Sequence, residues 1–359
     1  MRILLIRTSA LGDVVHALPV LRALRRQLPD AHISWVLEGW IAPLLANDPD
    51  LNEIVEVSLR SWRRLPWHRH LGHWLRLRQH LRQLRPDVVL DLMGNHKAAF
   101  IARLSGCRRR VGLRREDRRE PSSSLWINQP VPALGNHAVD RMLSVLQGLD
   151  LLTESSSFGG ELLRPDLTPD EHQHLKTLPQ RYAVILPGAG WGNKTWTASH
   201  WAAVAAELER RIELPTLLAP GPGEEDLTEA ILQQSAQHEL RISSAGVLSI
   251  PGLVSLLRNA EVVLGGDTGP GHLAHALHTP TIMIHGPTDP HRHGLWRAEE
   301  YSLAHRLPCS YCHKRFDSPK ACLLRLSPHR VADAAIARIR QHPNPPASES
   351  ASTDRSFNR

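Results

Sequence analysis

Residues 265–272, with the sequence Gly-Gly-Asp-Thr-Gly-Pro-Gly-His, carry the clearest chemical signal in the chain. An apolar run that predicts a buried strand precedes them, and a helix-like run follows. The turn would therefore present free backbone N–H groups at a helix N-terminus, and its glycines would let a ligand approach closely. Asp267, Thr268 and His272 add polar side chains at the same place. The pattern predicts a phosphate site, with an ordinary strand–helix turn as the alternative.

A second candidate group follows the first predicted strand, in the sequence Thr-Ser-Ala-Leu-Gly-Asp at residues 8–13. Asp13 stands at the start of a helix, whose dipole favours the ionised carboxylate. One interpretation is a general base that takes a proton from an attacking hydroxyl. The other is a carboxylate that only caps its own helix.

Three further loops end predicted strands in the second half of the chain. Residues 187–196 carry Lys194 among glycines and tryptophans, and this lysine could neutralise a diphosphate. After the next strand, Glu224 or Glu225 could bind both ribose hydroxyls or could cap the following helix. In the loop 285–290, prolines fix the backbone, whose polar groups could recognise a base.

Three cysteines, Cys309, Cys312 and Cys322, have part of the spacing of a structural zinc site, with His313 as a candidate fourth ligand. The second Cys-x-x-Cys pair that such a site usually has is missing. The spacing therefore favours a loop with a disulfide or with free thiols over a metal centre.

The charge of the chain is unevenly distributed. Residues 60–119 contain 17 Arg and Lys against 4 Asp and Glu, and nearly all the basic ones are arginine. Arginine binds phosphates and carboxylates through paired hydrogen bonds, so this stretch predicts an anionic partner. Nucleic acid, an acidic membrane surface and an acidic substrate remain open, as does a solvated surface that binds nothing.

Two domains are expected to position these groups, because 359 residues exceed the usual size of one domain. The chain has no apolar run long enough to span a membrane, and its N-terminus predicts a first strand rather than a signal peptide. Four cysteines and no export signal are typical of a reduced, cytoplasmic protein.

Strands and helices alternate in both halves of the sequence, which predicts doubly wound parallel sheets. The predicted strands are residues 3–6, 32–37, 54–57, 88–92, 111–113, 182–186, 215–219, 262–264 and 281–285. The predicted helices are residues 12–27, 71–85, 97–104, 137–149, 198–211, 224–234, 271–277 and 328–340. Ligands of such sheets bind beyond the carboxyl ends of the strands, where all four candidate loops and Asp13 would lie.

The expected fold class is therefore α/β, with two Rossmann-like domains facing each other across a cleft. An N-terminal domain is expected over residues 1–155 and a second domain over residues 170–325, with a polar linker between them. A C-terminal helix would occupy residues 326–342. Residues 343–359 are rich in Pro, Ser and Asn and are expected to be disordered.

Taken together, these motifs resemble those of the family 9 glycosyltransferases, the ADP-heptose:lipopolysaccharide heptosyltransferases. The resemblance covers nearly the whole chain up to the tail and implies the GT-B fold. The motifs that carry it are Ser-x-x-Gly-Asp at residues 9–13, Lys-x-Trp at 194–196, Asp-Thr-Gly-x-x-His at 267–272 and Gly-Pro-Thr at 286–288.

Three segments, residues 60–64, 119–121 and 137–141, are most similar to the type I enzymes, which add the first heptose to Kdo. The resemblance implies that Asp13 is the catalytic base. It implies an acceptor site made of Arg60, Arg63, Arg64, Arg119 and Arg141. It implies a donor site made of Lys194, Glu224, Asp267, Thr268, Gly269 and His272.

The implied activity is an inverting transfer of heptose from ADP-heptose to an anionic, lipid-linked acceptor, either Kdo–lipid A or the lipopolysaccharide inner core. The transfer would need no metal and no cofactor. The chain would be cytoplasmic, and peripheral contact with the inner membrane is left open. Ala10, where the type I enzymes often have serine, and the glycine-rich segment 188–193 leave the acceptor open.

Three alternatives remain at this stage. Another family 9 enzyme, of heptosyltransferase II or III type or with a different sugar nucleotide, would share the same motifs. A nicotinamide-dependent oxidoreductase is disfavoured because residues 8–12 lack the Gly-x-Gly-x-x-Gly pattern. A nucleic-acid-binding protein would leave the four ligand loops unexplained, so we expect no nucleic acid partner.

Overall fold

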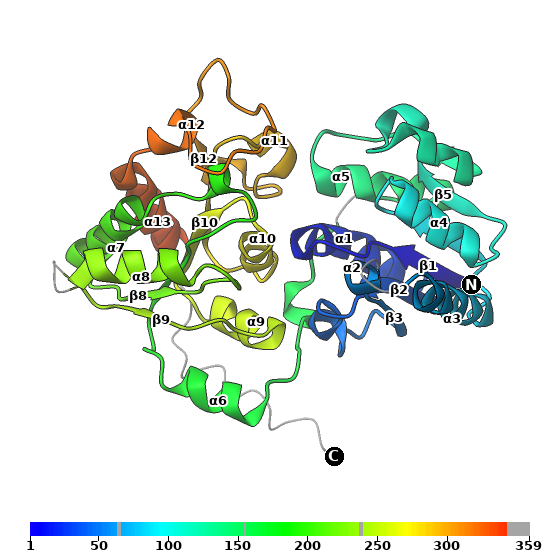
Figure 1. Cartoon of the computed structure of the whole chain (residues 1–359), viewed down its shortest axis with the longest axis horizontal. Helices are drawn as coiled ribbons and strands as arrows, with labels where there is room; N and C mark the ends of the chain where they lie inside the picture. Colours follow the sequence, from blue (N-terminus) through cyan, green and yellow to red (C-terminus); the bar gives the residue numbers. More distant parts are fainter. Residues whose placement is uncertain (63–65, 154–155, 237–239, 343–359) are drawn as a thin grey trace. The chain divides into compact units, whose positions relative to one another are not determined.

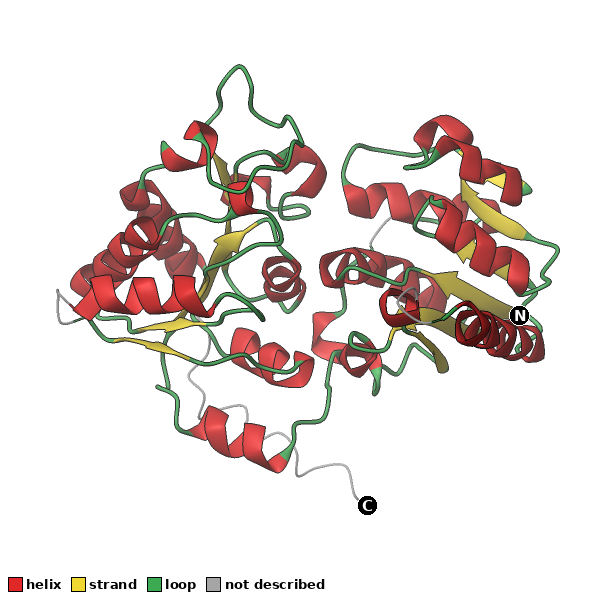
Figure 2. Cartoon of the chain, viewed as in Figure 1, coloured by secondary structure: helices red, strands yellow, loops and turns green. Residues whose placement is uncertain are grey.

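The computed structural model describes residues 1–62, 66–153, 156–236 and 240–342. The chain divides into two compact units, Met1–Asp166 (unit 1) and Leu167–Arg359 (unit 2). Each unit has a central sheet with helices on both faces, as Figures 1 and 2 show. The expected tail at residues 343–359 lies outside the described ranges.

The sheet of unit 1 has six parallel strands in the order β3-β2-β1-β4-β5-β6. The strands are β1 (Arg2–Ile6), β2 (His32–Glu38), β3 (Glu53–Val57), β4 (Val88–Asp91), β5 (Arg110–Leu113) and β6 (Gln129–Val131). This is the order of a Rossmann-like sheet, in which the winding reverses between β1 and β4. The loops after these two strands therefore lie at the point where such sheets bind ligands.

Helices cover both faces of this sheet. On one face, Leu4 and Ile6 of β1 share a core with α3 (Trp67–Gln83) and α4 (His96–Leu104). Ile3 and Leu5 alternate with them and are equally buried on the other face, where α1 (Leu11–Gln27) contacts α5 (Ala138–Leu143). The shorter helical elements are η1 (Ala42–Leu45), α2 (Leu59–Trp62), η2 (Arg115–Asp117), η3 (Pro121–Trp126), η4 (Ser144–Leu149) and η5 (Gly160–Leu162). The single helix expected at residues 137–149 is thus α5 continued by the 3-10 helix η4.

Unit 2 repeats this plan with the strand order β12-β11-β10-β7-β8-β9, again all parallel. Its strands are β7 (Ala183–Leu186), β8 (Thr216–Leu218), β9 (Ile242–Ser244), β10 (Val262–Gly266), β11 (Thr281–His285) and β12 (Ser302–Ala304). Its helices are α6 (Pro169–Lys176), η6 (Gly192–Lys194), α7 (Ala198–Ile212), α8 (Glu225–Ala236), α9 (Ile250–Arg258), α10 (Gly269–Ala276), α11 (Pro290–His293), η7 (Glu299–Tyr301), α12 (Ala321–Leu324) and α13 (Pro328–Gln341).

The C-terminal helix α13 belongs to the core of unit 2. Val331, Ala335 and Ile336 pack in one cluster with strand residues and with Trp201 of α7. The expected helix at residues 328–340 is confirmed, and its apolar stripe explains why it docks there. None of the helices in the described ranges is both long and apolar enough to cross a lipid bilayer.

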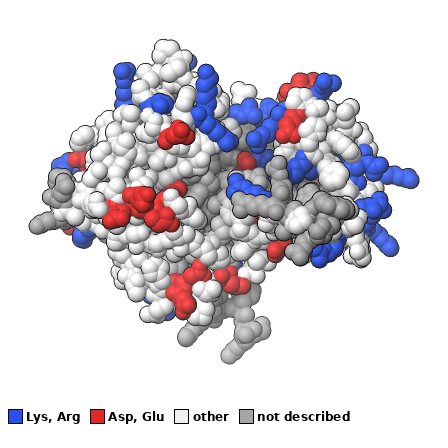
Figure 3. Space-filling model, in the orientation of Figure 1, with Lys and Arg blue, Asp and Glu red and all other residues white. Residues whose placement is uncertain are grey.

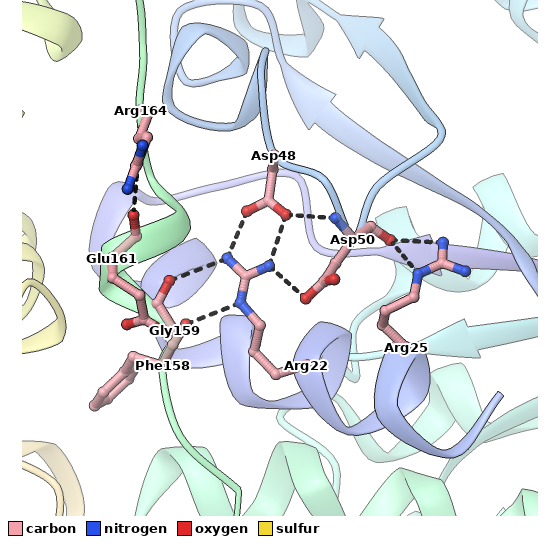
Figure 4. Close-up of polar contacts among 8 residues, drawn as sticks. All are labelled: Arg22, Arg25, Asp48, Asp50, Phe158, Gly159, Glu161 and Arg164. Carbon is pink, nitrogen blue, oxygen red and sulfur yellow. Dashed lines mark hydrogen bonds and ion pairs between the residues drawn. The ribbon is translucent and has the colours of Figure 1, made fainter. Parts of the chain in front are cut away.

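A buried arginine of α1 joins three separate segments of unit 1 (Figure 4). The two terminal nitrogens of the Arg22 guanidinium bind Asp48 at 2.6 and 2.5 Å, and one of them also binds Asp50 at 2.8 Å. Arg22 also donates to the carbonyls of Phe158 (3.1 Å) and Gly159 (3.4 Å). Gly159 has a φ of 62°, and a Cβ there would overlap the Arg22 side chain, so only glycine fits. Arg22 therefore ties the last segment of unit 1 to its first helix.

Replacing Arg22 by methionine is expected to lower the free energy of unfolding by about 3–5 kcal/mol, because Asp48 would remain buried without a counter-charge. Urea titration of the full chain measures this change. Arg78→Met, at an exposed position of α3, is the control and is expected to cost less than ~0.5 kcal/mol. If Arg22→Met lowers the free energy of unfolding as little as the control does, the structural role of Arg22 is contradicted.

Candidate functional site

The turn between β10 and α10 places three of the expected donor residues at a helix N-terminus. Thr268 is the N-cap residue of α10, and Gly269 is the first residue of the helix. The Thr268 hydroxyl is buried and, among the described residues, has no hydrogen-bond partner. A free hydroxyl beside the N–H groups of a helix N-terminus suits the oxygens of a phosphate.

Asp267 organises the side chains around this turn. Its carboxylate accepts hydrogen bonds from Lys194 Nζ at 2.7 Å and His272 Nε2 at 3.1 Å. Burial alone would raise the pKa of Asp267, but the His272 hydrogen bond and the Lys194 charge outweigh it, and the pKa lies well below its usual value. Asp267 is therefore ionised in the folded protein and holds Lys194 and His272 in fixed positions.

Lys194 reaches this carboxylate from the loop after β7. It ends the short helix η6, and its Nζ also donates to the Asp267 carbonyl at 3.2 Å. The ammonium lies 4.7 Å from the centre of the Trp191 ring. Lys194 is thus oriented by an ion pair, a carbonyl and an aromatic face, as a phosphate-binding lysine would need to be.

Glu224 and Glu225, which the sequence does not distinguish, have different surroundings. The Glu224 carboxylate accepts from the Gly221 N–H at 2.9 Å, and a Cβ at Gly188 would overlap it. Glu225 is exposed and accepts from the Gly223 N–H at 3.2 Å. Of the two, Glu224 therefore contacts the loop that carries Lys194, and a side chain at position 188 would displace its carboxylate.

Two histidines near Asp267 are held in the neutral form. Burial lowers the pKa of His285 to about 4, although the Asp267 charge acts in the opposite direction. The pKa of His293 is lowered to about 4 by the same two opposing effects. His285 Nε2 is buried and makes no hydrogen bond to any described residue, while Nδ1 lies 3.4 Å from the Thr288 hydroxyl. His285, at the start of the loop 285–290, thus lies within electrostatic reach of Asp267, while the expected backbone role of this loop stays a prediction.

In the described ranges, including the cysteine segment, no group of three or more His, Cys, Asp or Glu is placed to hold a metal ion. Cys309 and Cys312 are exposed, Cys322 is buried, and all three are free thiols. None of the three is in a disulfide within the described residues, and the preference for a loop over a metal centre stays a prediction.

In unit 1, Asp13 makes the cap contact of one interpretation, while its role as a base stays a prediction. It lies in the first turn of α1, and its Oδ2 accepts from the Ala10 N–H at 3.2 Å, as in a cap. Its Oδ1 pairs with Arg7 at 2.5 Å, and 38% of the side chain remains exposed. Arg7, which the sequence analysis did not single out, also donates to the Leu92 carbonyl and so fixes Asp13 relative to β4.

The arginines proposed for the acceptor differ in their surroundings. Arg60 and Arg119 are exposed, and both follow the carboxyl ends of strands. Arg141 is half-buried and donates to the Asp117 carbonyl at 2.5 Å, so the structure gives it a positioning contact. Arg63 and Arg64 lie outside the described residues. Lys and Arg side chains are prominent over unit 1 in Figure 3.

Two buried acidic groups at the same edge of unit 1 were missed by sequence reasoning, because each lies at the end of an apolar strand and belongs to none of the motifs that the sequence analysis identified. Asp91 ends β4 and forms an ion pair with Arg118 in which both side chains are fully buried. Glu38 ends β2, and burial raises its pKa, while the charges of Lys97 and Arg60 act to lower it. Arg60 therefore lies within electrostatic reach of a buried carboxyl group.

Comparison with known proteins gives a consistent result. Residues 74–322 match the profile of glycosyltransferase family 9 (heptosyltransferase). The chain is 32% identical to lipopolysaccharide heptosyltransferase 1 of Pseudomonas aeruginosa, over 94% of this chain and 98% of the relative. It is 28% identical to lipopolysaccharide heptosyltransferase 1 of Escherichia coli K12, over 81% and 89% of the two chains. In fold it is similar to a solved structure of E. coli heptosyltransferase WaaC with ADP, with a TM-score of 0.76 and 24% identity over 94% of this chain and all of the other. This likeness confirms the expected GT-B class of two Rossmann-like units.

Stability is expected to fall as the pH is lowered from about 7 to 5, because His285 must stay neutral in the folded state. The pKa of His285 is about 4 in the folded state and about 6.5 in the unfolded state. The stability that neutral His285 contributes to the folded state is therefore complete above pH 6.5 and is lost as the pH falls toward 4. For His285 alone the loss at pH 5 is about 2 kcal/mol. Urea titrations at pH 7.5 and 5.0 measure it.

The variant His285→Phe isolates this effect. It is expected to be less stable than the wild type at pH 7.5 but to lose less stability between pH 7.5 and 5.0. His172→Phe, at an exposed position of α6, serves as the control and should keep the wild-type pH dependence. An unchanged pH dependence in His285→Phe would contradict the prediction.

Proposed function

Because this chain belongs to glycosyltransferase family 9, we propose that it transfers heptose from ADP-heptose to the Kdo residue of a lipopolysaccharide inner core. The observation that carries the proposal is the similarity to a type 1 heptosyltransferase over nearly the full length of both chains. Family membership favours sugar transfer over the oxidoreductase and nucleic-acid-binding alternatives. Types 2 and 3 and other sugar nucleotides remain the alternatives within the family.

The donor is proposed to bind to unit 2. Its diphosphate would lie at the N-terminus of α10, beside the Thr268 hydroxyl, Gly269 and the Lys194 ammonium. Glu224, held over Gly188 and Gly221, would accept hydrogen bonds from the ribose hydroxyls. Asp267 and His272 would act by positioning, since their mutual hydrogen bond and the ion pair with Lys194 already engage them.

The reaction is proposed to be a direct displacement that inverts the anomeric carbon. The acceptor hydroxyl gives its proton to Asp13, its oxygen forms a bond to the anomeric carbon, and the bond from that carbon to the β-phosphate oxygen breaks. ADP leaves with the bonding electrons, and Lys194 and the N–H groups of α10 stabilise its charge. Asp13 Oδ1 and Oδ2 each accept one hydrogen bond, and a carboxylate has further lone pairs, so the group retains capacity to accept a proton.

We further propose that the transfer needs no divalent metal, because the Lys194 ammonium and the N–H groups of α10 would donate hydrogen bonds to the phosphate oxygens that a metal otherwise binds. The Asp-x-Asp pair formed by Asp48 and Asp50 is already bound to Arg22, which supports this proposal. Activity is then expected to survive treatment with a chelator.

A lipid-linked acceptor would place the chain at the cytoplasmic face of the inner membrane, as a peripheral protein. Three elements of unit 1 support such contact, because the sequences of α3, α4 and η3 contain no Asp or Glu. Leu71, Leu75 and Leu125 are exposed on them, and Phe100 contacts the rings of Trp74 and Trp126. Exposed apolar groups among basic residues suit a membrane surface with acidic lipids. Sedimentation with vesicles of such lipids tests this contact.

The direct test of the activity is to incubate the chain with ADP-heptose and either Kdo-terminated lipid A or a core that already carries one heptose, and to weigh the products. We expect a mass gain of one heptose on the Kdo-terminated acceptor. A gain only on the heptose-bearing core would favour a type 2 or 3 enzyme. No gain on either acceptor would contradict the proposal.

Asp13→Asn is expected to reduce turnover by about 10²–10⁴-fold, because a neutral amide cannot take the proton of the acceptor. The affinity for ADP, measured by calorimetry, should stay within about twofold because Asp13 belongs to unit 1. Asp30→Asn, at an exposed position of unit 1, is the control and should keep full turnover. Near-normal turnover of Asp13→Asn would remove its assignment as the base.

Arg119→Ala is expected to raise the KM for the acceptor by about tenfold or more, with the KM for ADP-heptose unchanged, because it removes charge-assisted hydrogen bonds to an anion. Arg108→Ala is the matched control: Arg108 is also exposed, but it precedes β5, at the opposite edge of the sheet. If both variants raise the acceptor KM equally, the effect reflects overall charge, and the site assignment is wrong.

A further inference from the structure

The segment between Cys312 and Cys322 is hydrogen-bonded to the loop that carries Lys194. Asn193 is buried and makes three hydrogen bonds to this segment: its N–H donates to the Phe316 carbonyl (3.0 Å), its side-chain amide donates to the Lys314 carbonyl (2.8 Å), and its side-chain oxygen accepts from the Phe316 N–H (3.3 Å). A Cβ at Gly192 would overlap the Asp317 carbonyl, so the loop that carries Lys194 and the segment 312–322 lie in close contact. A third contact fixes the start of the segment, where the His313 N–H donates to the Pro287 carbonyl at 3.0 Å.

This arrangement places a second cation over the aromatic ring that Lys194 contacts. The Arg315 guanidinium lies 4.4 Å from the centre of the Trp191 ring, the same ring that lies 4.7 Å from Lys194 Nζ. Stacking on an aromatic face holds the planar group of arginine while leaving its N–H donors available. Arg315 remains exposed, as a group that meets a soluble ligand must be.

The charges of the two cations are balanced differently. Lys194 is paired with the buried Asp267 carboxylate, so the pair together carries no net charge. Arg315, in contrast, forms no ion pair with any carboxylate of the described residues. A diphosphate monoester or diester carries at least two negative charges, which the Lys194–Asp267 pair alone does not compensate.

We propose that Arg315 is a donor-binding residue that contacts the diphosphate of the nucleotide sugar, with Trp191 and Asn193 as positioning residues. This inference rests on the proposed donor site and extends it to a segment that the family motifs do not include. The Arg315 guanidinium would donate two hydrogen bonds to phosphate oxygens. It would also compensate the negative charge that develops on the diphosphate as ADP departs.

The test is calorimetric titration of the full chain with ADP, AMP and adenosine. For Arg315→Ala we expect the dissociation constant for ADP to rise about tenfold or more, since a hydrogen bond to a charged group is lost, whereas adenosine binding should not change. Arg315→Lys should recover part of the loss. Lys320→Ala is the matched control, because Lys320 belongs to the same segment and also lies over an aromatic ring, that of Phe316, at 5.1 Å.

The outcomes separate this inference from the proposed function. If the wild type binds ADP and Arg315→Ala binds it equally well, the inference is wrong while the donor site stands. If ADP binding weakens in Arg315→Ala but the wild type transfers no heptose, the inference stands and the proposed function falls. If the wild type does not bind ADP, both are wrong. An equal loss for adenosine and ADP in Arg315→Ala would indicate a general distortion and would also overturn the inference.

Discussion

The buried carboxylate of Asp267 is the interaction on which the arrangement of unit 2 depends. It joins the loop after β7, through Lys194, to the first turns of α10, through His272. A buried carboxylate is costly unless its partners are well placed, so the two loops are held at a fixed separation. The same ion pair determines how much free positive charge the site can offer a ligand, which is why the charge of Arg315 matters.

The second constraint on this site is the lack of room for side chains where its loops pack against each other. Glycine is required at position 192 because the Asp317 carbonyl occupies the place of a side chain, and glycine at position 188 leaves room for the Glu224 carboxyl group. The glycines of these loops therefore serve packing between loops as well as approach of a ligand. A sequence motif that records only their presence does not reveal which neighbour each one accommodates.

Much of the fold could be predicted from the sequence, because the central strands are apolar runs buried on both faces of a parallel sheet. The strand at residues 281–285 was predicted with the bounds it has in the structure, and the family resemblance drawn from four motifs is confirmed. The edge strands β6, β9 and β12 were missed, since each has three residues and little apolar character, such as Gln-Pro-Val in β6. Short edge strands depend on a neighbouring strand more than on their own composition.

The residues of the candidate site likewise fall into those that the sequence could identify and those that it could not. Motifs identified Lys194, Glu224 and Asp267 because each lies a few residues from a glycine-rich turn. They could not identify Arg7, Asn193 or Arg315, whose partners come from distant parts of the sequence: Leu92, Phe316 and Trp191. Such pairs follow from tertiary packing, which a local pattern does not encode. The roles assigned to Asp13 and to the acceptor arginines stay predictions.

The central claim is that the diphosphate of an ADP-sugar binds at the N-terminus of α10. A crystal structure of the chain with ADP tests it most directly. The account predicts phosphate oxygens within hydrogen-bond distance of the Thr268 hydroxyl, the Gly269 N–H and Lys194 Nζ. ADP bound elsewhere on the chain, with the Thr268 hydroxyl still without a partner, would contradict it.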